Sequence, residues 1–408
     1  LILKHNLYGL DICPRASQLA NLTLILKARC EARRFFQAEQ ITRPHVMNLL
    51  NIHFESHELN SYLHNTCLGE HLSPLILKLI RQFEDVQNHG SLLRPCVDFD
   101  AISNALQVIQ AKDLSGDLVL LGTHEKVLRA LRQARALARR YECVVLNPPY
   151  LNRPNATLKI FLERHYKDFK SDLFAAFVGS TACLVKAHGF VGLVTPNVWM
   201  YLKSHQELRN TLLEQHSLES LVELPLAGFT GATVQLSAYI FKNNKPSAKH
   251  QASFIRLVDF RHESEMEPRT IDAISDPNCG WRFRTSTSNF RKLPGSPLAY
   301  WISDSLANVF ARFSRLSDFG ETRIGLITGD NSYYIRFWHE VGIDRVGVGL
   351  SRHEAAQSGL RWFPQSKGGD FRRWYGNHET VVDWSCDGRE LQTRLHSTGE
   401  RTLAHNFN

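Results

Sequence analysis

A short apolar run that leads directly into Asn-Pro-Pro-Tyr constrains the fold more than any other stretch of the sequence. Cys143–Leu146 is short and β-branched and follows the basic, helix-like segment KVLRALRQARALARRY, which predicts a buried parallel strand. The tetrapeptide therefore falls at the carboxyl end of a strand, the edge at which open α/β sheets bind ligands. Its residues are Asn147, Pro148, Pro149 and Tyr150.

This tetrapeptide is suited to holding an exocyclic amine. The two prolines fix the backbone and remove two N–H donors, so nearby carbonyl oxygens face no competing donors. The Asn147 side-chain oxygen and the Pro148 carbonyl can both accept hydrogen bonds from one planar NH2 group, and Tyr150 can stack on the ring that carries it. We expect the ring of Tyr150, rather than its hydroxyl, to matter. The alternative is an ordinary strand end with a Pro-Pro turn and an exposed tyrosine.

Composition indicates a globular chain without metal or membrane segments. With 408 residues, 43% of them hydrophobic, it can bury a full core and divide into two domains. Lys plus Arg (48) exceed Asp plus Glu (40) by 8, which suits a polyanionic partner. The eight cysteines include no CxxC pair, so neither a metal site nor a disulfide framework is expected. Free thiols and the lack of a long apolar run favour a cytoplasmic protein.

Strand-like and helix-like segments alternate through the first 245 residues. Strands are expected at 7–12, 44–54, 143–146, 190–200, 217–225 and 233–243. Helices are expected after Pro14, at 73–86, at 100–110, in the basic segment to 140, and at 171–189 with Gly189 closing the last one. This alternation predicts an α/β fold with a Rossmann-like, doubly wound, mostly parallel sheet.

The composition and periodicity of the sequence change at about residue 246. Residues 246–300 mix Pro, Ser and charge with little periodicity, which indicates a connecting region. Residues 301–408 interleave aromatic with basic residues, as stacking on bases and contact with phosphates require; an ordinary β-rich domain with surface cation–π pairs is the alternative. The residues that carry this hypothesis are Arg361, Trp362, Lys367, Arg372, Arg373, Trp374 and Tyr375.

Several segments together resemble a known enzyme family. LYGLDICPRASQLA, LNPPY, SDLFAAFV, GFVGLVTP and GLITGDN…RFW occur in the order found in N6-adenine DNA methyltransferases of the gamma type. KGGDFRRWYG and VVDW further resemble the large adenine-specific methyltransferases of BREX phage-defence systems. The resemblance implies a catalytic domain over 1–245 and the start of a DNA target-recognition domain over 301–408. It also implies S-adenosylmethionine as cofactor, and double-stranded DNA and other BREX components as partners.

The resemblance also implies roles for single residues. Asp11, at the end of a strand, would hold the ribose hydroxyls of S-adenosylmethionine, although a solvated strand-end acid is the alternative. Asn147 and Pro148 would grip the N6 amine of a flipped adenine, with Asn147 also bordering the cofactor, and Tyr150 would stack on the base. No metal and no covalent nucleophile are required.

Three further residues have open alternatives. Phe229 resembles the second aromatic contact to the base, or it belongs to the core. Asp85 is a candidate for the acidic motif near the adenine, but its local pattern is loose and favours a residue without that role. Asp172 is expected to cap the helix that follows it.

One family motif is missing from the sequence. The glycine-rich loop after the first strand, which wraps the methionine part of the cofactor, has no counterpart, and both ends look like cuts in a longer chain. We therefore expect a sheet that is incomplete at its N-terminus and weak binding of S-adenosylmethionine by the chain as it stands. The rival interpretations are the methyltransferase part of a type IIG restriction-modification enzyme, an inactive DNA-binding fragment, or an amino-methyltransferase that acts on RNA or protein.

Overall fold

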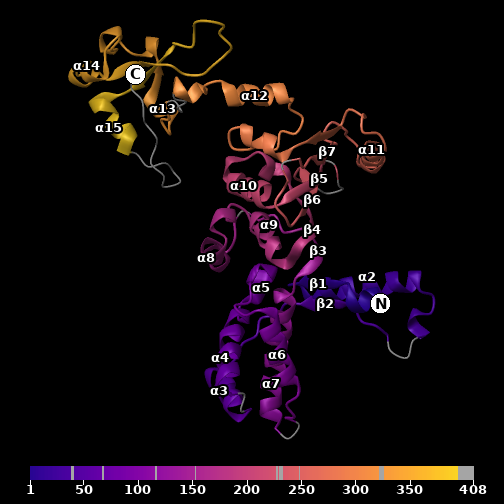
Figure 1. Ribbon diagram of the computed structural model, residues 1–408. Coiled ribbons are helices and arrows are strands. Elements are labelled where there is room, and N and C mark those ends of the chain that lie inside the picture. Colours follow the sequence, from indigo (N-terminus) through magenta and orange to yellow (C-terminus); the bar gives the residue numbers. More distant parts are fainter. Residues whose placement is uncertain are drawn as a thin grey trace. The chain divides into compact units, whose positions relative to one another are not determined.

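The computed structural model describes most of the chain, and these residues form two compact units, Leu1–Phe313 and Ser314–Asn408 (Figure 1). The larger unit contains a two-stranded and a six-stranded sheet, and the smaller unit a three-stranded sheet. The described residues are 1–37, 41–66, 69–114, 117–151, 153–226, 228, 233–247, 249–320 and 326–393.

The two-stranded sheet follows a short helix, α1 (Ile2–His5), and is one β-α-β unit. Strands β1 (Tyr8–Asp11) and β2 (His45–Asn48) pair in parallel, and α2 (Pro14–Glu31) connects them. Pro14 is the first residue of α2, where its missing N–H costs nothing, so the predicted strand and helix are confirmed.

The expected strand at 44–54 is much shorter, because a side chain replaces the strand partner beyond Asn48. The Gln133 amide oxygen accepts from the backbone N–H of Leu50 at 2.7 Å, and the Gln133 amide nitrogen donates to the Leu50 carbonyl at 3.1 Å. These two bonds satisfy the backbone of Leu50 outside any sheet.

A group of helices packs around one hydrophobic core in this part of the unit, and Figure 1 shows α3 and α4 beside α6 and α7. The helix expected at 73–86 instead begins at Gly69, contains Pro74, and ends at Ile80 before the 3-10 turn Arg81–Phe83. The helices are α3 (Ser56–Asn65), α4 (Gly69–Ile80), α5 (Val86–His89), α6 (Phe99–Gln110) and α7 (Leu118–Ala138).

The six-stranded sheet has the strand order β3-β4-β6-β5-β7-β8 and is mixed. The pairs β3/β4 and β5/β7 are parallel, whereas β4/β6, β5/β6 and β7/β8 are antiparallel. The α/β class is confirmed: β3, β4, β5 and β7 run in one direction, and the insertion of β6 and the addition of β8 in the opposite direction make the sheet mixed. The strands are β3 (Tyr141–Leu146), β4 (Val185–Pro196), β5 (Ser217–Glu223), β6 (Leu236–Lys242), β7 (Ala252–Arg256) and β8 (Arg282–Thr285).

Strand β3 is parallel as predicted, but it is not buried on both faces. Val144 and Leu146 pack against the core of the sheet, while Val145 is 79% exposed and Cys143 is also exposed. Among the described strands β3 pairs only with β4, so it lies at an edge of its sheet.

The helix expected at 171–189 is shorter because β4 starts immediately after it. Helix α9 (Leu173–Leu184) ends at Leu184, and Gly189 lies within β4 rather than at a helix end. A Cβ on Gly189 would lie 2.6 Å from the Glu142 carbonyl oxygen, so glycine permits the close approach of β3 and β4. Beyond Pro196 the expected strand becomes the 3-10 turn Asn197–Met200.

The chain beyond residue 246 continues the same sheet, so the division into compact units falls at residue 313 and not near 246. Strand β7 pairs with β5 and β8 pairs with β7, and Phe254, Phe290 and Tyr300 belong to the core of the sheet. The remaining helices of this unit are α8 (Ala156–His165), α10 (Gln206–Gln215), α11 (Glu263–Ser275) and α12 (Asp304–Arg312).

The smaller unit has its own sheet and its own core. The sheet order is β10-β11-β9, all antiparallel, and the core includes Tyr334, Phe363, Val382 and Trp384. Its elements are α13 (Asn331–Tyr334), β9 (Ile335–Phe337), α14 (Arg352–Gln357), β10 (Trp362–Gln365), β11 (Thr380–Asp383) and α15 (Ser385–Thr393), the last with a left-handed turn at its start.

Candidate active site at the carboxyl ends of the parallel strands

Four strands of the larger sheet end at one edge. Strands β4 and β5 are both antiparallel to β6, so they run parallel to each other, and β3 and β7 run in the same direction. Asn147 follows β3, Asn197 follows β4, and Glu223 is the last residue of β5. Polar side chains from distant parts of the sequence are thereby collected at this carboxyl edge.

Asn147 and Tyr150 form a hydrogen-bonded pair at the end of β3. The Tyr150 hydroxyl donates to Asn147 Oδ1 at 2.8 Å and lies 3.4 Å from the carbonyl oxygen of Val194 in β4. Burial raises the pKa of Tyr150, so its hydroxyl stays protonated and remains a donor at neutral pH. Between the two, Pro148 is buried and Pro149 is exposed.

Asp172 holds the chain as it leaves this pair. Its Oδ1 accepts from the backbone N–H of Phe174 at 3.2 Å, so its predicted role as the cap of α9 is confirmed. The same oxygen accepts from the N–H of Leu151 at 3.2 Å, and the Leu151 carbonyl accepts from the N–H of Leu173. Both the backbone N–H and the carbonyl of Leu151, the residue after Tyr150, are therefore hydrogen-bonded.

Asp11 ends β1 beside an acceptor that the sequence reasoning missed. Asp11 Oδ1 accepts from the N–H of Cys13 at 2.7 Å, which orients the carboxylate at the start of α2. Asn48 is its partner across the parallel pair, and Asn48 Oδ1 is buried without a hydrogen-bond partner in the described part of the chain. A buried acceptor without a donor is costly, so this oxygen is available to a donor from outside the described chain. No signal in the sequence indicated this, because Asn48 falls in the middle of the strand predicted at 44–54, whereas the observed strand β2 ends at Asn48.

Glu223 is a second site residue that the sequence reasoning missed. Its buried carboxylate accepts from Asn197 Nδ2 at 3.1 Å and from the hydroxyls of Tyr201 at 2.5 Å and Tyr300 at 2.6 Å. Burial and the nearby carboxylate both raise the pKa of Tyr201 and of Tyr300, so both hydroxyls remain donors. The sequence VELP, with an acid near the end of a strand, was the local signal that could have identified Glu223. The sequence around its partners at 197, 201 and 300 gave no comparable signal.

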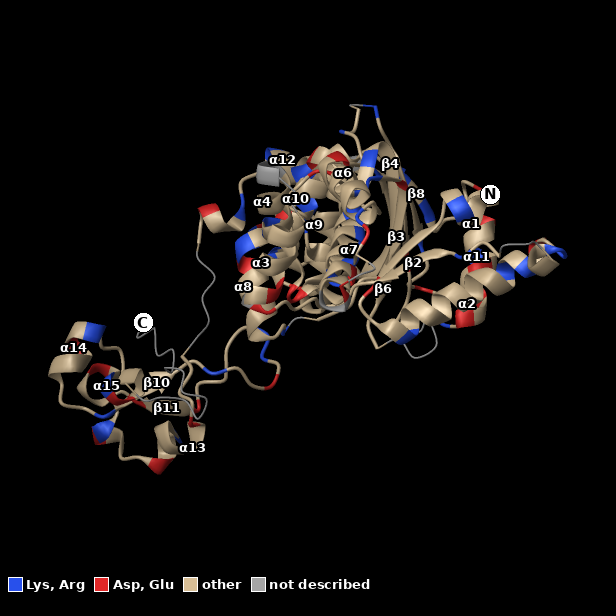
Figure 2. Ribbon diagram, turned by 90° about the horizontal axis from the view of Figure 1, so that it is seen from below, with Lys and Arg blue, Asp and Glu red and all other residues tan. Residues whose placement is uncertain are grey.

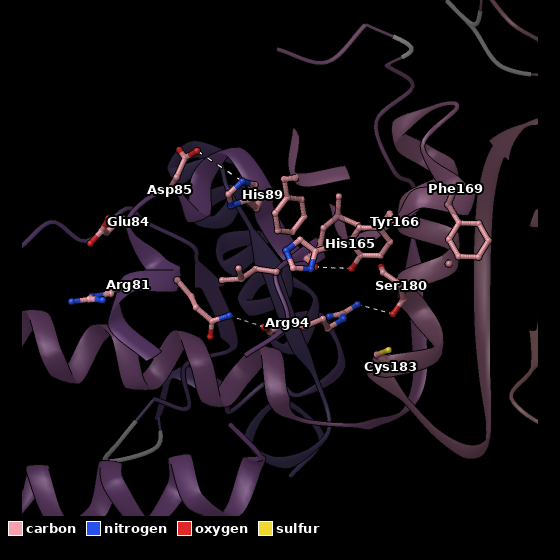
Figure 3. Close-up of a pocket in the computed structure, with 15 residues that line it drawn as sticks. Arg81, Glu84, Asp85, His89, Arg94, His165, Tyr166, Phe169, Ser180 and Cys183 are labelled. Carbon is pink, nitrogen blue, oxygen red and sulfur yellow. Dashed lines mark hydrogen bonds and ion pairs between the residues drawn. The ribbon is translucent and has the colours of Figure 1, made fainter. Parts of the chain in front are cut away.

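Asp85 lines a neighbouring cavity of about 550 Å³ (Figure 3). Its carboxylate accepts from Asn88 Nδ2 at 3.1 Å and lies 4.0 Å from His89 Nε2. In the same cavity His89 stacks on Phe161 with ring centres 4.0 Å apart. The lining of this cavity includes neither Asp11 nor residues 147–150, so Asp85 is not brought against Tyr150 within it.

A pair of amides links the Asp85 segment to the chain beyond Tyr150. Asn155 Nδ2 donates to Asn88 Oδ1 at 2.9 Å, and Asn88 Nδ2 lies 3.4 Å from Asn155 Oδ1. Asn155 also caps α8, because its Oδ1 accepts from the N–H of Leu158. Phe229, the other expected contact, lies outside the described residues.

The described part of the chain offers neither a cluster of metal ligands nor a membrane-spanning helix. Within it, no three His, Cys, Asp or Glu side chains cluster so that they could hold a metal ion. Nor does any helix in that part of the chain combine the length and apolar character that crossing a membrane requires.

Comparison with known proteins identifies the family. Residues 5–229 match the model of the Eco57I restriction-modification methylase, and the chain belongs to that family. It is 30% identical over 417 residues to the adenine-specific methyltransferase PglX of Lacticaseibacillus casei (strain Zhang), covering 100% of this chain and 34% of that protein. It is 32% identical over 424 residues to the adenine-specific methyltransferase BrxX of Escherichia coli O9:H4 (strain HS), covering 96% of this chain and 33% of that protein.

These findings confirm the resemblance that the motifs predicted. The chain spans about a third of the length of these curated relatives. Among solved structures, the type IIG restriction endonuclease BpuSI aligns with 67% of this chain and 41% of its own, at 12% identity and a TM-score of 0.32. A TM-score this low carries no argument about the fold, which is established from the strands and helices themselves.

Proposed function

We propose that this chain is the catalytic part of a DNA N6-adenine methyltransferase that takes its methyl group from S-adenosylmethionine. The observation that carries the proposal is the Asn147–Tyr150 pair at the carboxyl edge of the larger sheet, in a chain of the Eco57I methylase family. An amide oxygen and an aromatic ring, fixed against each other, match the amine and the ring of a nucleobase.

Asn147 and Pro148 act on the amine of a flipped adenine. The N6 lone pair is delocalised into the adenine ring, so the amine is a poor nucleophile. Two acceptors on its hydrogens, Asn147 Oδ1 and the Pro148 carbonyl, favour a pyramidal nitrogen and aim the lone pair outward. The new N–C bond would form as the methyl–sulfur bond of the sulfonium breaks to leave a neutral thioether, and N6 would release one proton to water and end as a neutral amine. No general base with a strongly shifted pKa is required.

Tyr150 contributes in two ways to this arrangement. Its ring stacks on the base and offsets part of the cost of flipping, which is a few kcal/mol. Its hydroxyl occupies one lone pair of Asn147 Oδ1 and so holds that oxygen in place, which leaves the second lone pair for the amine.

The end of the two-stranded sheet fits the nucleoside part of S-adenosylmethionine. Asp11 offers a carboxylate to the ribose hydroxyls, and Asn48 offers its unpartnered oxygen to an exocyclic amine. S-adenosylmethionine, when bound, supplies an electrophilic methyl group. This fit depends on the buried acceptor of Asn48. A measurement of S-adenosylmethionine binding, rather than of methylation, tests it.

DNA is favoured over RNA or protein as substrate because of the smaller unit, which displays aromatic and basic side chains together. Both named relatives are adenine-specific methyltransferases. This similarity supports a role in a BREX-type phage-defence system, in which methylation marks the cell's own DNA, together with further components of that system. The methyltransferase part of a type IIG restriction-modification enzyme is the alternative.

The test is the Asn147→Ala substitution in the full-length protein. We expect N6 methylation of adenine-unmethylated DNA to fall about 100- to 1,000-fold, as when one preorganised polar group is removed from an active site, while DNA binding persists. Asn104→Ala, on the exposed face of α6, is the matched control and should methylate at the wild-type rate. Wild-type methylation by Asn147→Ala would exclude the role of the tetrapeptide.

A further inference from the structure

The connection between β10 and β11 displays three large aromatic side chains to solvent. We call residues 366–379 the aromatic loop; within it Phe371, Trp374 and Tyr375 are 87%, 88% and 84% exposed. By contrast, Trp362 and Trp384 of the same unit are buried, with only 9% and 3% of their surface exposed. Three exposed rings within five residues form an apolar surface of the kind that marks an interaction site.

The loop has a defined conformation rather than an arbitrary one. The antiparallel pairing of β10 and β11 closes its base, where Gln365 faces Thr380. Nearer the tip, Asn377 Nδ2 donates to the Asp370 carbonyl at 3.2 Å, and both Gly376 and Asn377 have positive φ. The rings are thus held outward by backbone geometry, without packing against the core of the unit.

The charges of the loop complement a polyanion. Lys367, Arg372 and Arg373 are exposed and form no ion pair with the described residues. Two other arginines of the unit are already engaged: Arg352 pairs with Asp387 at 2.9 Å, and Arg361 with buried Asp383 at 2.8 Å. Lys and Arg are interspersed with Asp and Glu in both units (Figure 2), so net charge alone does not single out this loop.

We propose that the aromatic loop binds DNA where the duplex is opened, stacking its rings on unstacked bases while its basic side chains pair with the adjacent phosphates. This rests on the proposed function, because flipping an adenine leaves a gap and an unpaired partner base beside the enzyme. The faces of bases inside an intact duplex are covered by their neighbours, so exposed rings gain little there. The proposal also divides the residues expected from sequence: Arg361 and Trp362 maintain the fold, and Phe371 joins the contact residues.

Two variants separate the rings from the charges. The 408-residue chain is titrated with labelled duplexes, one intact and one with an abasic site opposite an unpaired base, at several salt concentrations. The triple variant Phe371→Ala, Trp374→Ala, Tyr375→Ala should lose about 5- to 150-fold in affinity for each ring that stacks, on the abasic duplex only. Its salt dependence should match that of the wild type.

The variant Arg372→Gln, Arg373→Gln should instead weaken binding to both duplexes and reduce the slope of log K against log salt by about 1.8. The matched controls are Phe319→Ala, which removes a ring that is 79% exposed outside the loop, and Arg389→Gln, which removes an exposed charge on α15. Both controls should bind like the wild type. Unchanged melting temperatures establish that every variant is folded.

Three outcomes would overturn the proposal. The first is wild-type affinity of the triple variant for the abasic duplex. The second is an equal loss on both duplexes, which would indicate general contact without stacking. The third is no DNA binding by the folded wild-type chain, which would leave the loop as a surface for a protein partner. Because Asn147→Ala is tested by methylation, the loop can fail while the proposed function stands.

Discussion

The carboxyl edge of the six-stranded sheet and the aromatic loop both present tyrosine and other rings, but they hold them in opposite ways. At the sheet edge the hydroxyls of Tyr150, Tyr201 and Tyr300 each donate to a fixed acceptor on a strand end or the turn that follows it. In the loop, Phe371 and Trp374 are exposed to solvent, and Trp374 has the Arg373 guanidinium 5.7 Å from its ring centre rather than a fixed hydrogen-bond acceptor. Chemistry needs the first kind of order, since small displacements are costly there. Contact with a deformable partner needs only the second.

The largest expected effect is on stability at the sheet edge. Glu223→Ala leaves the buried donors of Asn197 and Tyr300, and the partly exposed hydroxyl of Tyr201, without their acceptor, at roughly 1–3 kcal/mol for each buried donor that finds no substitute. We expect the free energy of unfolding to fall by several kcal/mol in denaturant titrations. Phe371→Ala is the counterpart in the loop and should change it by less than about 0.5 kcal/mol. An equal loss of free energy of unfolding in the two variants would contradict the difference between the sheet edge and the loop.

Next in size is the effect of the Tyr150 hydroxyl on the methylation rate. Tyr150→Phe keeps the ring and removes the donor to Asn147, so kcat should fall roughly 2- to 10-fold while KM for DNA stays constant. Tyr150→Ala should in addition raise KM. This revises the expectation from sequence that only the ring matters. A Tyr150→Phe enzyme with unchanged kcat would show that Asn147 needs no positioning.

Asn48 provides a smaller and more specific test. Because its side-chain oxygen lacks a partner, Asn48→Ala should leave the melting temperature unchanged or slightly higher. Calorimetry on the full-length protein should at the same time show affinity for S-adenosylmethionine reduced by about 5- to 10-fold, the value of one hydrogen bond. Lower stability with unchanged affinity would make Asn48 a structural residue.

The smallest expected effect is a pH dependence in the Asp85 cavity. Burial lowers the pKa of His89 and of His165, so the folded chain takes up their protons less readily than the unfolded chain does. Stability is therefore complete above about pH 6.5 and is lost as pH falls towards the lowered folded values. His89→Phe preserves the stack on Phe161 and should flatten the melting temperature between pH 7.5 and 5.5. The control variant His57→Phe, at an exposed position, should leave the pH dependence of the melting temperature as in the wild type.

Local features of the site could be predicted from sequence because each is encoded within a few residues. The position of the tetrapeptide after a strand, Asp11 at the end of β1, Pro14 at the start of α2 and the cap at Asp172 all follow from neighbouring residues. The roles assigned to Asn147, Tyr150, Asp11, Phe229 and Asp85 in binding and catalysis remain predictions.

The arrangement of the strands could not be predicted, because it depends on distant pairings. Alternating strands and helices suggest a parallel sheet only if every connection is a helix, and the stretch between β5 and β6 has no helical pattern. Likewise, nothing near residue 300 indicates that Tyr300 donates to Glu223. The change of composition near 246 does not mark a boundary between compact units, since β7 and β8 still join the sheet.

The edge position of β3 has a practical consequence for handling the protein. The outer side of this strand has backbone groups that no described strand pairs with, and it displays Val145 and the thiol of Cys143. Such an edge is a template for pairing with another extended chain, and an exposed thiol allows that pairing to become covalent. Concentrated preparations without reductant should therefore accumulate dimers cross-linked through Cys143. Replacing Cys143 with serine should remove this cross-link, while the other exposed cysteines, Cys13, Cys30, Cys96, Cys183 and Cys386, stay available.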